Sequence, residues 1–204
     1  MIEKKTIILG LTGSIGMGKT TTAKMFSKRG IPVWDADKTV HYLYKDDKET
    51  IRAFRKEIPQ VIVNNQVSRG ALKKFLIEDD ENIKKIEKII HPIVAKERAK
   101  FLSAAENKNM PLVVLDIPLL FETGNDTAVD YVAVVTVDLK TQRKRVLDRN
   151  TMSEEMFNSI LSKQISNKVK KERADFIIST KSIASAQDKV DKIIAKFVGS
   201  KKNA

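Results

Sequence analysis

The sequence contains no cysteine and only two histidines among its 204 residues. Without cysteine the chain can form neither a disulfide framework nor a thiolate metal site, and His41 and His91 are too few for a histidine-based zinc centre. It also lacks a hydrophobic run long enough to span a membrane, and its start, "MIEKKTIILG", has an apolar run too short for a signal peptide. We therefore expect a cytoplasmic protein without a metal centre of the thiolate or histidine type.

What the sequence does contain fits one packed α/β domain. Hydrophobic residues make up 42% of the chain, which is enough for a core. The net charge of +12, from 38 basic and 26 acidic residues, favours anionic partners, although a solvated lysine-rich surface has the same composition. Basic runs such as "IKKIEKII" and "KVKKER" are spread along the chain and form no arm or stripe interleaved with aromatics, so we expect no nucleic-acid partner.

Strand and helix patterns alternate over most of the chain. Short β-branched apolar runs without alternation predict buried parallel strands at 6–11, 31–35, 111–116, 131–137 and 174–179. Helical patterns separate them at 19–29, 37–45, 141–147, 153–170 and 185–197. This order predicts a single domain over residues 1–204, an α/β fold with a parallel five-stranded sheet and helices on both of its faces.

Residues 37–110 interrupt this alternation, because after the second strand they read almost wholly as helix. The segments "SRGALKKFLIEDD" and "DENIKKIEKII" each carry an apolar face, and "VAKERAKFLSAAE" continues the pattern. Pro92 lies between the last two segments and is expected to interrupt the helix. We predict a helical insertion on the ligand edge of the sheet.

A glycine-rich segment follows the first predicted strand. Residues 13–20, "GSIGMGKT", fit the pattern G-x-x-x-x-G-K-[ST], with an apolar run before it and an amphipathic helix after it. Glycines let the backbone approach a ligand closely, and successive N–H groups together with the start of the helix form an anion site. The pattern predicts a site for nucleotide phosphates in which Lys19 reaches the β- and γ-phosphates and the Thr20 hydroxyl ligates Mg²⁺.

Acidic residues end the second and third predicted strands. Asp35 and Asp37 lie where open α/β sheets place their ligands, and one of them, Asp37 by preference, could accept the proton of an attacking hydroxyl. The alternative is that one of the two caps the following helix. Asp116 ends the third strand, where a carboxylate commonly helps to hold Mg²⁺ directly or through its water shell.

Two arginines follow the fourth strand in "QRKRVLDR". Arg145 and Arg149 are four residues apart and share one face of the predicted helix. Two guanidinium groups suit the spread charge of a transferring phosphoryl group, and a solvated basic face is the alternative. Further segments also have a structural interpretation: Pro118 to Phe121 form an apolar lip or ordinary core, and His91 is more often a satisfied structural histidine.

Taken together, these motifs resemble the dephospho-coenzyme A kinase family, a family of P-loop kinases, from about Ile7 to Asp191. The resemblance rests on "GLTGSIGMGKTT", "DAD" with histidine four residues later, "SRGAL", "IIHPIV", "VVLDIPLLFE", "QRKRVLDR", and "ILSKQ" followed by "ADFII". The glycine-rich loop alone is generic, whereas "PLLFE" after a strand, together with "DAD" and "HP", is close to diagnostic.

The resemblance implies transfer of the ATP γ-phosphoryl group, with Mg²⁺, to the 3′-hydroxyl of the ribose of dephospho-coenzyme A, the last step of coenzyme A synthesis. By position, the ATP-phosphate site would comprise Gly13, Ser14, Ile15, Gly16, Met17, Gly18, Lys19, Thr20 and Thr21. Asp37 matches the base, Asp35 is its rival, and Arg145 and Arg149 belong to a lid over 140–170. The insertion 37–110 would bind the acceptor, near His91, Pro118, Leu119, Leu120, Phe121 and Glu122.

Some positions depart from the family pattern. The family usually has glycine at the position of Ser14, serine at that of Met17, and asparagine near the adenine after "ADFII", where this chain has Ser179 and Thr180. Adenine recognition is therefore expected to differ in detail, while phosphate binding is retained. We expect a monomer or small homo-oligomer with no membrane partner.

Two kinds of rival function remain open. Another P-loop kinase, acting on a nucleoside or nucleoside monophosphate, would need extra arginines near the insertion, and Arg52, Arg55, Arg69 and Arg98 are available. A nucleotide switch or a nucleic-acid-binding module would use the +12 charge. A guanine switch normally carries an N-K-x-D-like motif after a later strand, and the sequence has none. Oligonucleotide binding with steep salt dependence and no ATP turnover would identify the second kind.

Overall fold

The computed structural model describes residues 6–149 and 152–199, which form two compact units. The first unit holds the chain up to Trp34 and from Ala105 onward, and the second unit is Asp35–Ala104. The first contains the main sheet, and the second overlaps residues 37–110, whose role as an acceptor-binding insertion stays a prediction. Residues 150 and 151, within the predicted lid, lie outside the described residues.

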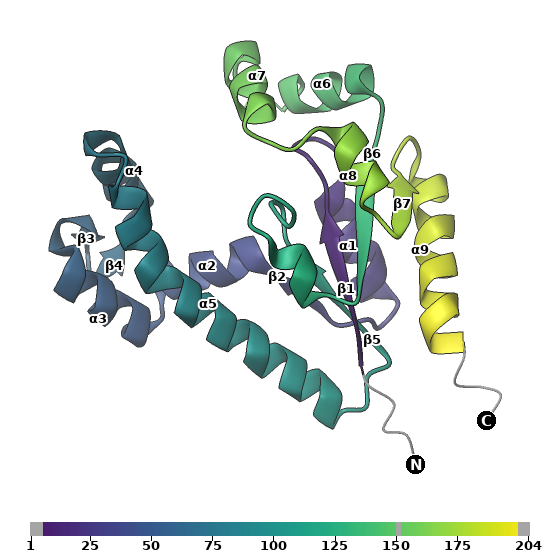
Figure 1. Ribbon diagram of the computed structural model, residues 1–204, viewed down its shortest axis with the longest axis horizontal. Helices are drawn as coiled ribbons and strands as arrows, with labels where there is room; N and C mark the ends of the chain where they lie inside the picture. The colour runs from purple at the N-terminus through teal and green to yellow at the C-terminus, as the bar shows by residue number, and fades with distance from the viewer. Residues whose placement is uncertain (1–5, 150–151, 200–204) are drawn as a thin grey trace. The chain divides into compact units, whose positions relative to one another are not determined.

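The main sheet has five parallel strands, as predicted, in the order β2-β5-β1-β6-β7 (Figure 1). Their bounds are β1 (Ile7–Thr12), β2 (Val33–Asp35), β5 (Leu112–Asp116), β6 (Tyr131–Thr136) and β7 (Phe176–Ser179). In register, Gly10 of β1 lies opposite Leu115 of β5 and Val132 of β6. Because β1 is the central strand, the glycine-rich loop that follows it emerges at the middle of the sheet's carboxyl edge.

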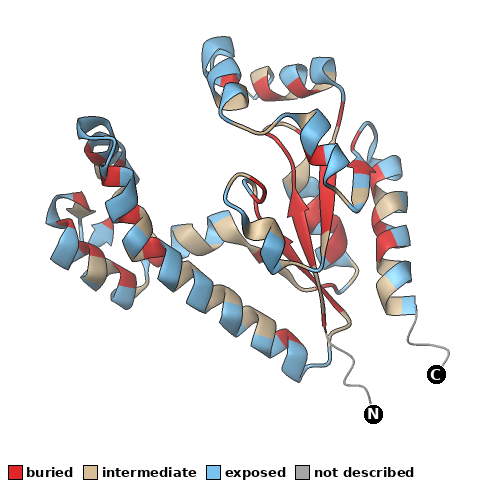
Figure 2. Ribbon diagram, in the orientation of Figure 1, coloured by how far each residue is buried: buried red, intermediate tan, exposed pale blue. Residues whose placement is uncertain are grey.

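The main helices of this unit come after strands β1, β6 and β7 along the chain. They are α1 (Lys19–Lys28), α6 (Leu139–Leu147), α7 (Glu154–Ser162), α8 (Asn167–Glu172) and α9 (Ile183–Val198), with a short 3₁₀ turn at Asn125–Ala128. The apolar faces of α1 and α9 pack on the sheet, where Phe26, Val190 and Ile193 join Leu9 and Leu11 in one buried core. Figure 2 shows the strands of this sheet as the most continuously buried part of the unit.

The prediction of one helix over 153–170 is wrong, because the structure has two helices there, α7 and α8. Ser153 caps the start of α7 by accepting from Met156 N, and Ser166 caps a second start by accepting from Val169 N. A serine hydroxyl competes for backbone N–H groups, so a polar segment such as "SKQIS" favours ending one helix and beginning another.

The second unit is built from α2 (Ala36–Lys45), α3 (Lys48–Glu57), α4 (Arg69–Glu78) and most of α5 (Asn82–Asn107), with a 3₁₀ turn at Pro59–Val61. Its own core gathers Leu43, Phe54, Phe75, Ile86 and Ile90. The unit is mostly helical, and its one hairpin, which the prediction from the sequence did not include, is formed by β3 (Ile62–Val63) and β4 (Gln66–Val67) in the described residues. Asn64 and Asn65, both with positive φ, make the two-residue turn between them, a conformation that asparagine tolerates.

Pro92 does not interrupt its helix, contrary to the prediction. It lies inside α5, which runs without a break from Asn82 to Asn107. The isoleucines before it, Ile86 and Ile90, and the partly buried Ile93 and Val94 after it pack on the same core. Tertiary packing on both sides therefore offsets the one backbone hydrogen bond that proline cannot make.

Across 6–149 and 152–199, no helix is both long enough and apolar enough for a membrane span.

Candidate functional site

The loop between β1 and α1 folds as a glycine-dependent cup. Gly16 and Gly18 adopt positive φ angles of 77° and 92°, which side chains disfavour. At Gly13 the constraint is contact, because a Cβ there would lie 2.3 Å from Val135 Cγ2 and 2.8 Å from the Val135 carbonyl oxygen. Glycine is thus required in this loop by backbone conformation at Gly16 and Gly18 and by the approach of β6 at Gly13.

The start of α1 is open toward a ligand. Its N-cap position is Gly18, which has no side chain with which to cap the helix, so the N–H groups of the first turn remain available to an anion. Thr20 and Thr21 expose their side chains on this turn, while Thr22 is buried and its hydroxyl donates to Gly18 O at 3.2 Å. The helix dipole adds a partial positive charge at the same place.

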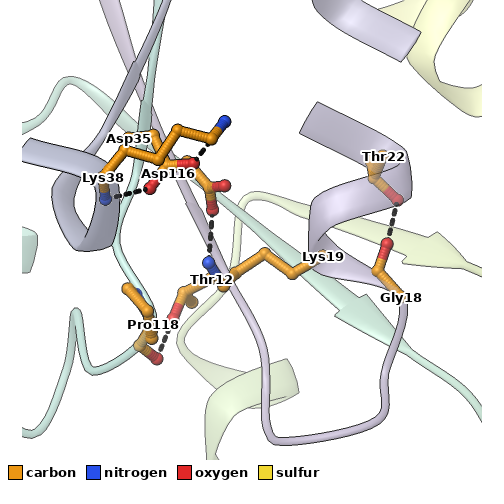
Figure 3. Close-up of polar contacts among 8 residues, drawn as sticks. All are labelled: Thr12, Gly18, Lys19, Thr22, Asp35, Lys38, Asp116 and Pro118. Atoms are coloured by element: carbon orange, nitrogen blue, oxygen red, sulfur yellow. Dashed lines mark hydrogen bonds and ion pairs between the residues drawn. The ribbon is translucent and has the colours of Figure 1, made fainter. Parts of the chain in front are cut away.

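Lys19 pairs with Asp116 at the foot of the loop (Figure 3). Its Nζ lies 2.6 Å from Asp116 Oδ1, and the carboxylate side chain is only 3% exposed. The register explains this proximity, because Asp116, the last residue of β5, lies opposite Leu11 near the end of β1. The structure therefore brings together the predicted phosphate-binding cation and the predicted magnesium-binding carboxylate.

Two residues that sequence reasoning missed hold the loop from the β6–α6 side. Gln142, 2% exposed on α6, donates from Nε2 to Ile15 O at 2.7 Å. The backbone N–H of Val137 donates to the sulfur of buried Met17 at 3.2 Å. A signal for both existed, since each follows β6 at the carboxyl edge, but the partner could not be named without the fold.

A cavity of about 290 Å³ opens beside the loop within the first unit. It is lined by Gly18, Thr21, Thr22, Met25, Arg145, Arg149, Thr180, Ser182, Ile183 and Ala186. The apolar part comes from α1 and α9, and the two arginines supply positive charge. Both predicted lid arginines therefore line one cavity together with residues of the predicted phosphate site.

Arg145 is fixed in this cavity by Thr180, a further residue whose contact the sequence did not predict. Its Nη1 donates to Thr180 Oγ1 at 2.9 Å and its Nη2 donates to Thr180 O at 2.7 Å. The Thr180 hydroxyl in turn donates to Met17 O at 2.7 Å. One residue after β7 thus joins the phosphate loop to the arginine.

Helix α6, which carries Arg145, begins at an aspartate cap. Asp138 Oδ1 accepts from Thr141 N and Oδ2 from Thr141 Oγ1, both at 2.8 Å, which fixes the start of α6. These hydrogen bonds, the one from the backbone first, lower the pKa of Asp138 below its ordinary value of 3.8, with a smaller contribution from Lys181. Arg143 then pairs with Glu154 at 2.6 Å, linking α6 to α7.

Asp35 and Asp37 differ in their engagement within the second unit. Asp35 caps α2: its Oδ1 accepts from Lys38 N at 3.0 Å and its Oδ2 pairs with Lys38 Nζ at 2.9 Å (Figure 3). Asp37 is the second residue of the same helix, within its first turn, and is exposed. The capping role that the sequence left open between the two therefore belongs to Asp35.

The residues predicted to meet an acceptor have varied environments. Leu120 and Phe121 are buried in the first unit, with exposed fractions of 0% and 5%, whereas Leu119 is 41% exposed. Glu122 accepts from Ile165 N at 3.0 Å and lies 2.7 Å from Lys170 Nζ. His91 is exposed on the part of α5 that belongs to the second unit.

Oxygen donors suitable for magnesium are present but few. In the part of the chain that the structure describes, no cluster of three or more His, Asp or Glu side chains could hold a metal by itself. The Thr20 hydroxyl and the Asp116 carboxylate are hard oxygen ligands, and Mg²⁺ is usually held by one or two protein ligands together with substrate phosphates and water. The donor set fits a magnesium ion that arrives with a nucleotide.

Comparison with known proteins gives concordant matches. The family model described as Dephospho-CoA kinase matches residues 7–185. A dephospho-CoA kinase from Bradyrhizobium diazoefficiens is 49% identical over 173 residues, which cover 85% of this chain and 86% of that protein. A second, from Agrobacterium fabrum, is 42% identical over 192 residues, covering 94% and 98%. The solved structure of TT1252 from Thermus thermophilus has a TM-score of 0.82 at 28% identity, covering 98% of this chain and 100% of that one.

Proposed function

The chain belongs to the dephospho-CoA kinase family, and we propose that it transfers the γ-phosphoryl group of ATP to the 3′-hydroxyl of the ribose of dephospho-CoA. The hydroxyl oxygen forms the new bond to phosphorus, the bond from phosphorus to the β,γ-bridging oxygen breaks, and the hydroxyl proton passes to a base. The products are coenzyme A and ADP. A cytoplasmic location and a monomeric or small homo-oligomeric state remain predictions from the sequence.

The first unit supplies the groups that suit the ATP donor. The loop from Gly13 to Thr21 offers the phosphates its backbone N–H groups and the start of α1. Lys19, within this segment, adds a cation. The adjacent cavity of about 290 Å³, walled by Met25, Ile183 and Arg145, suits the nucleoside. In this assignment Arg145 and Arg149 bring positive charge to the spread charge of the transferring group.

Magnesium is proposed to bind between the protein and the phosphates. Thr20 Oγ1 and Asp116, directly or through water, would hold it, and when bound it neutralises the charge that develops on the phosphate oxygens. Because Asp116 is paired with Lys19 in the structure, we expect both side chains to change partner together as the nucleotide arrives: Lys19 toward phosphate and Asp116 toward the ion.

The second unit supplies the proposed base and part of the acceptor site. Asp37 is the proposed base, supported by its match to "DAD" of the family and by its exposed carboxylate, while Asp35 is occupied as the cap of α2. His91 and Pro118 to Glu122 are proposed to lie near the acceptor. For Leu120 and Phe121, burial indicates that they shape this segment from inside rather than by surface contact.

The observation that carries the proposal is the phosphate loop with its cavity in a chain whose family model matches residues 7–185. The test is ADP release with dephospho-CoA as the sole acceptor, run beside AMP, CMP and nucleosides at equal concentration. The matched control is 3′-deoxy-dephospho-CoA, which lacks only the attacking hydroxyl and should give no product. Equal or faster turnover of AMP or a nucleoside, or phosphate found at another position of the product, would reject the proposal.

A further inference from the structure

Thr180 uses every polar group it has, at the point where the end of β7 meets the phosphate loop. Its N–H donates to Thr136 O at 2.8 Å and its carbonyl accepts from Arg145 Nη2 at 2.7 Å. Its hydroxyl accepts from Arg145 Nη1 at 2.9 Å and donates to Met17 O at 2.7 Å. The side chain is almost fully enclosed, with the residue 8% exposed.

The chemistry of the partners fixes the direction of these hydrogen bonds. A guanidinium can only donate and the Met17 carbonyl can only accept, so the single hydroxyl proton points at Met17 and a lone pair faces Arg145. The other possible acceptor for that proton, Thr136 O, lies farther away at 3.4 Å. The hydroxyl therefore connects the backbone of the phosphate loop to the arginine, and its removal leaves Arg145 only the backbone carbonyl of Thr180 as a contact on this residue.

We propose that Thr180 is a positioning residue of the ATP site, acting through Arg145. An arginine side chain has many rotamers, and immobilising it when a ligand binds costs affinity. By holding the guanidinium at two points before the nucleotide arrives, Thr180 sets Arg145 at the cavity wall and so raises the affinity for ATP. This inference rests on the proposed function, because it assigns the cavity of about 290 Å³ to the ATP nucleoside.

The valine and serine variants separate the hydroxyl from the rest of the side chain. Thr180→Val keeps the shape but removes both hydroxyl contacts, and we expect the KM for ATP and the Kd for ATP to rise about tenfold. The KM for dephospho-CoA should change much less. Thr180→Ser keeps the hydroxyl and should restore most of the affinity for ATP.

A double-mutant cycle tests whether the effect passes through Arg145. In an Arg145→Ala background the valine and serine variants should have the same KM for ATP, because the hydroxyl no longer has an arginine to place. If the valine variant costs the same factor with and without Arg145, the residue acts only by bracing the loop, and the proposal is wrong. Equal ATP affinity of wild type and Thr180→Val would also overturn it.

A second variant covers the case in which Thr180→Val does not fold. Arg145→Lys leaves Thr180 intact, but the ammonium lacks the planar pair of nitrogens with which the guanidinium contacts the hydroxyl and the carbonyl separately, so it should weaken ATP binding to a similar extent. Unchanged ATP affinity in this variant would reject the inference. ATP binding is measured by calorimetry without an acceptor, so the outcome is independent of turnover. A wild type that binds ATP but does not phosphorylate dephospho-CoA would instead reject the proposed function.

Discussion

Lys19 Nζ lies 2.6 Å from Asp116 Oδ1, so the cation of the phosphate loop and the carboxylate at the end of β5 neutralise each other. The lysine side chain is 15% exposed, which leaves it accessible to a ligand, whereas the carboxylate is enclosed. A triphosphate with its magnesium ion offers each of them a stronger partner. We therefore propose that nucleotide binding exchanges the partners of an already assembled pair, so that neither side chain has to be drawn in from a fully solvated position.

Lys19→Ala should weaken ATP binding and lower kcat by ~10²–10³, because it removes a charge placed where negative charge gathers in the transition state. Steady-state kinetics with varied ATP, together with ATP binding by calorimetry, measure both effects. Lys24→Ala is the matched control, since Lys24 is an exposed lysine on the same helix, beyond the phosphate loop. Unchanged kinetics for Lys19→Ala would contradict the assignment of the loop to ATP phosphates.

Asp37→Asn should lower kcat by ~10²–10⁴ while ATP binding stays nearly intact, because the amide cannot accept the proton of the attacking hydroxyl. Asp35→Asn is the internal comparison. Asparagine is a good N-cap, so this variant keeps the hydrogen bond from Lys38 N and should retain most activity. If the Asp35 variant loses turnover and the Asp37 variant keeps it, the base is Asp35 and the present assignment fails.

Lys170→Met should lower the free energy of unfolding by about 3–5 kcal/mol, because it leaves the largely buried carboxylate of Glu122 without its counter-charge. Lys170 is fully buried, and its Nζ faces Glu122 Oε1 at 2.7 Å in an ion pair whose angles are not those of a hydrogen bond. Urea denaturation at neutral pH measures the change.

Two further variants make the result on Lys170 specific. Lys171→Met alters the adjacent exposed lysine and should change the free energy of unfolding by no more than about 0.5 kcal/mol. Adding Glu122→Gln to Lys170→Met removes the stranded charge but keeps an oxygen for Ile165 N, so it should recover much of the loss. Wild-type stability in Lys170→Met would show that the pair contributes nothing.

Asp138→Ala should lower the Tm at neutral pH, because it removes the cap of the helix that carries Arg145. The pKa of Asp138 is lowered in the folded protein, so its stabilising contribution is complete above the ordinary value of 3.8 and is lost as the pH falls below it. The Tm difference between wild type and Asp138→Ala should therefore shrink from pH 6 to pH 3.

Asp138→Asn separates the charge of this cap from its geometry. Asparagine can still accept from Thr141 N, but it does not titrate, so the Tm of this variant should fall less steeply toward acid than that of the wild type. A Tm difference between wild type and Asp138→Ala that stays constant with pH would assign the whole effect to something other than the ionised carboxylate.

The parts of this protein that could be predicted are those whose cause is local. A β-branched run without alternation has few options other than a buried strand, and glycines spaced as in "GSIGMGKT" after such a run leave the backbone little choice but a cup before a helix. The same locality explains the errors. The serine caps inside 153–170 and the Asn64–Asn65 turn have local signals, but each signal spans only a few residues and is easily overlooked. The continuity of α5 through Pro92 instead depends on packing against residues distant in the sequence.

The sequence by itself determined the parallel sheet, the glycine-rich loop and the family. Strand and loop propensities depend on neighbouring residues, and each motif of the family is a short segment that can be read directly. Only the tertiary structure decided that Gln142 would hold Ile15 and that Thr180, 163 positions along the chain from Met17, would join that loop to Arg145. Such contacts form because parallel strands end at one edge of a sheet, and the residues that meet there are chosen by strand order, which no local pattern specifies.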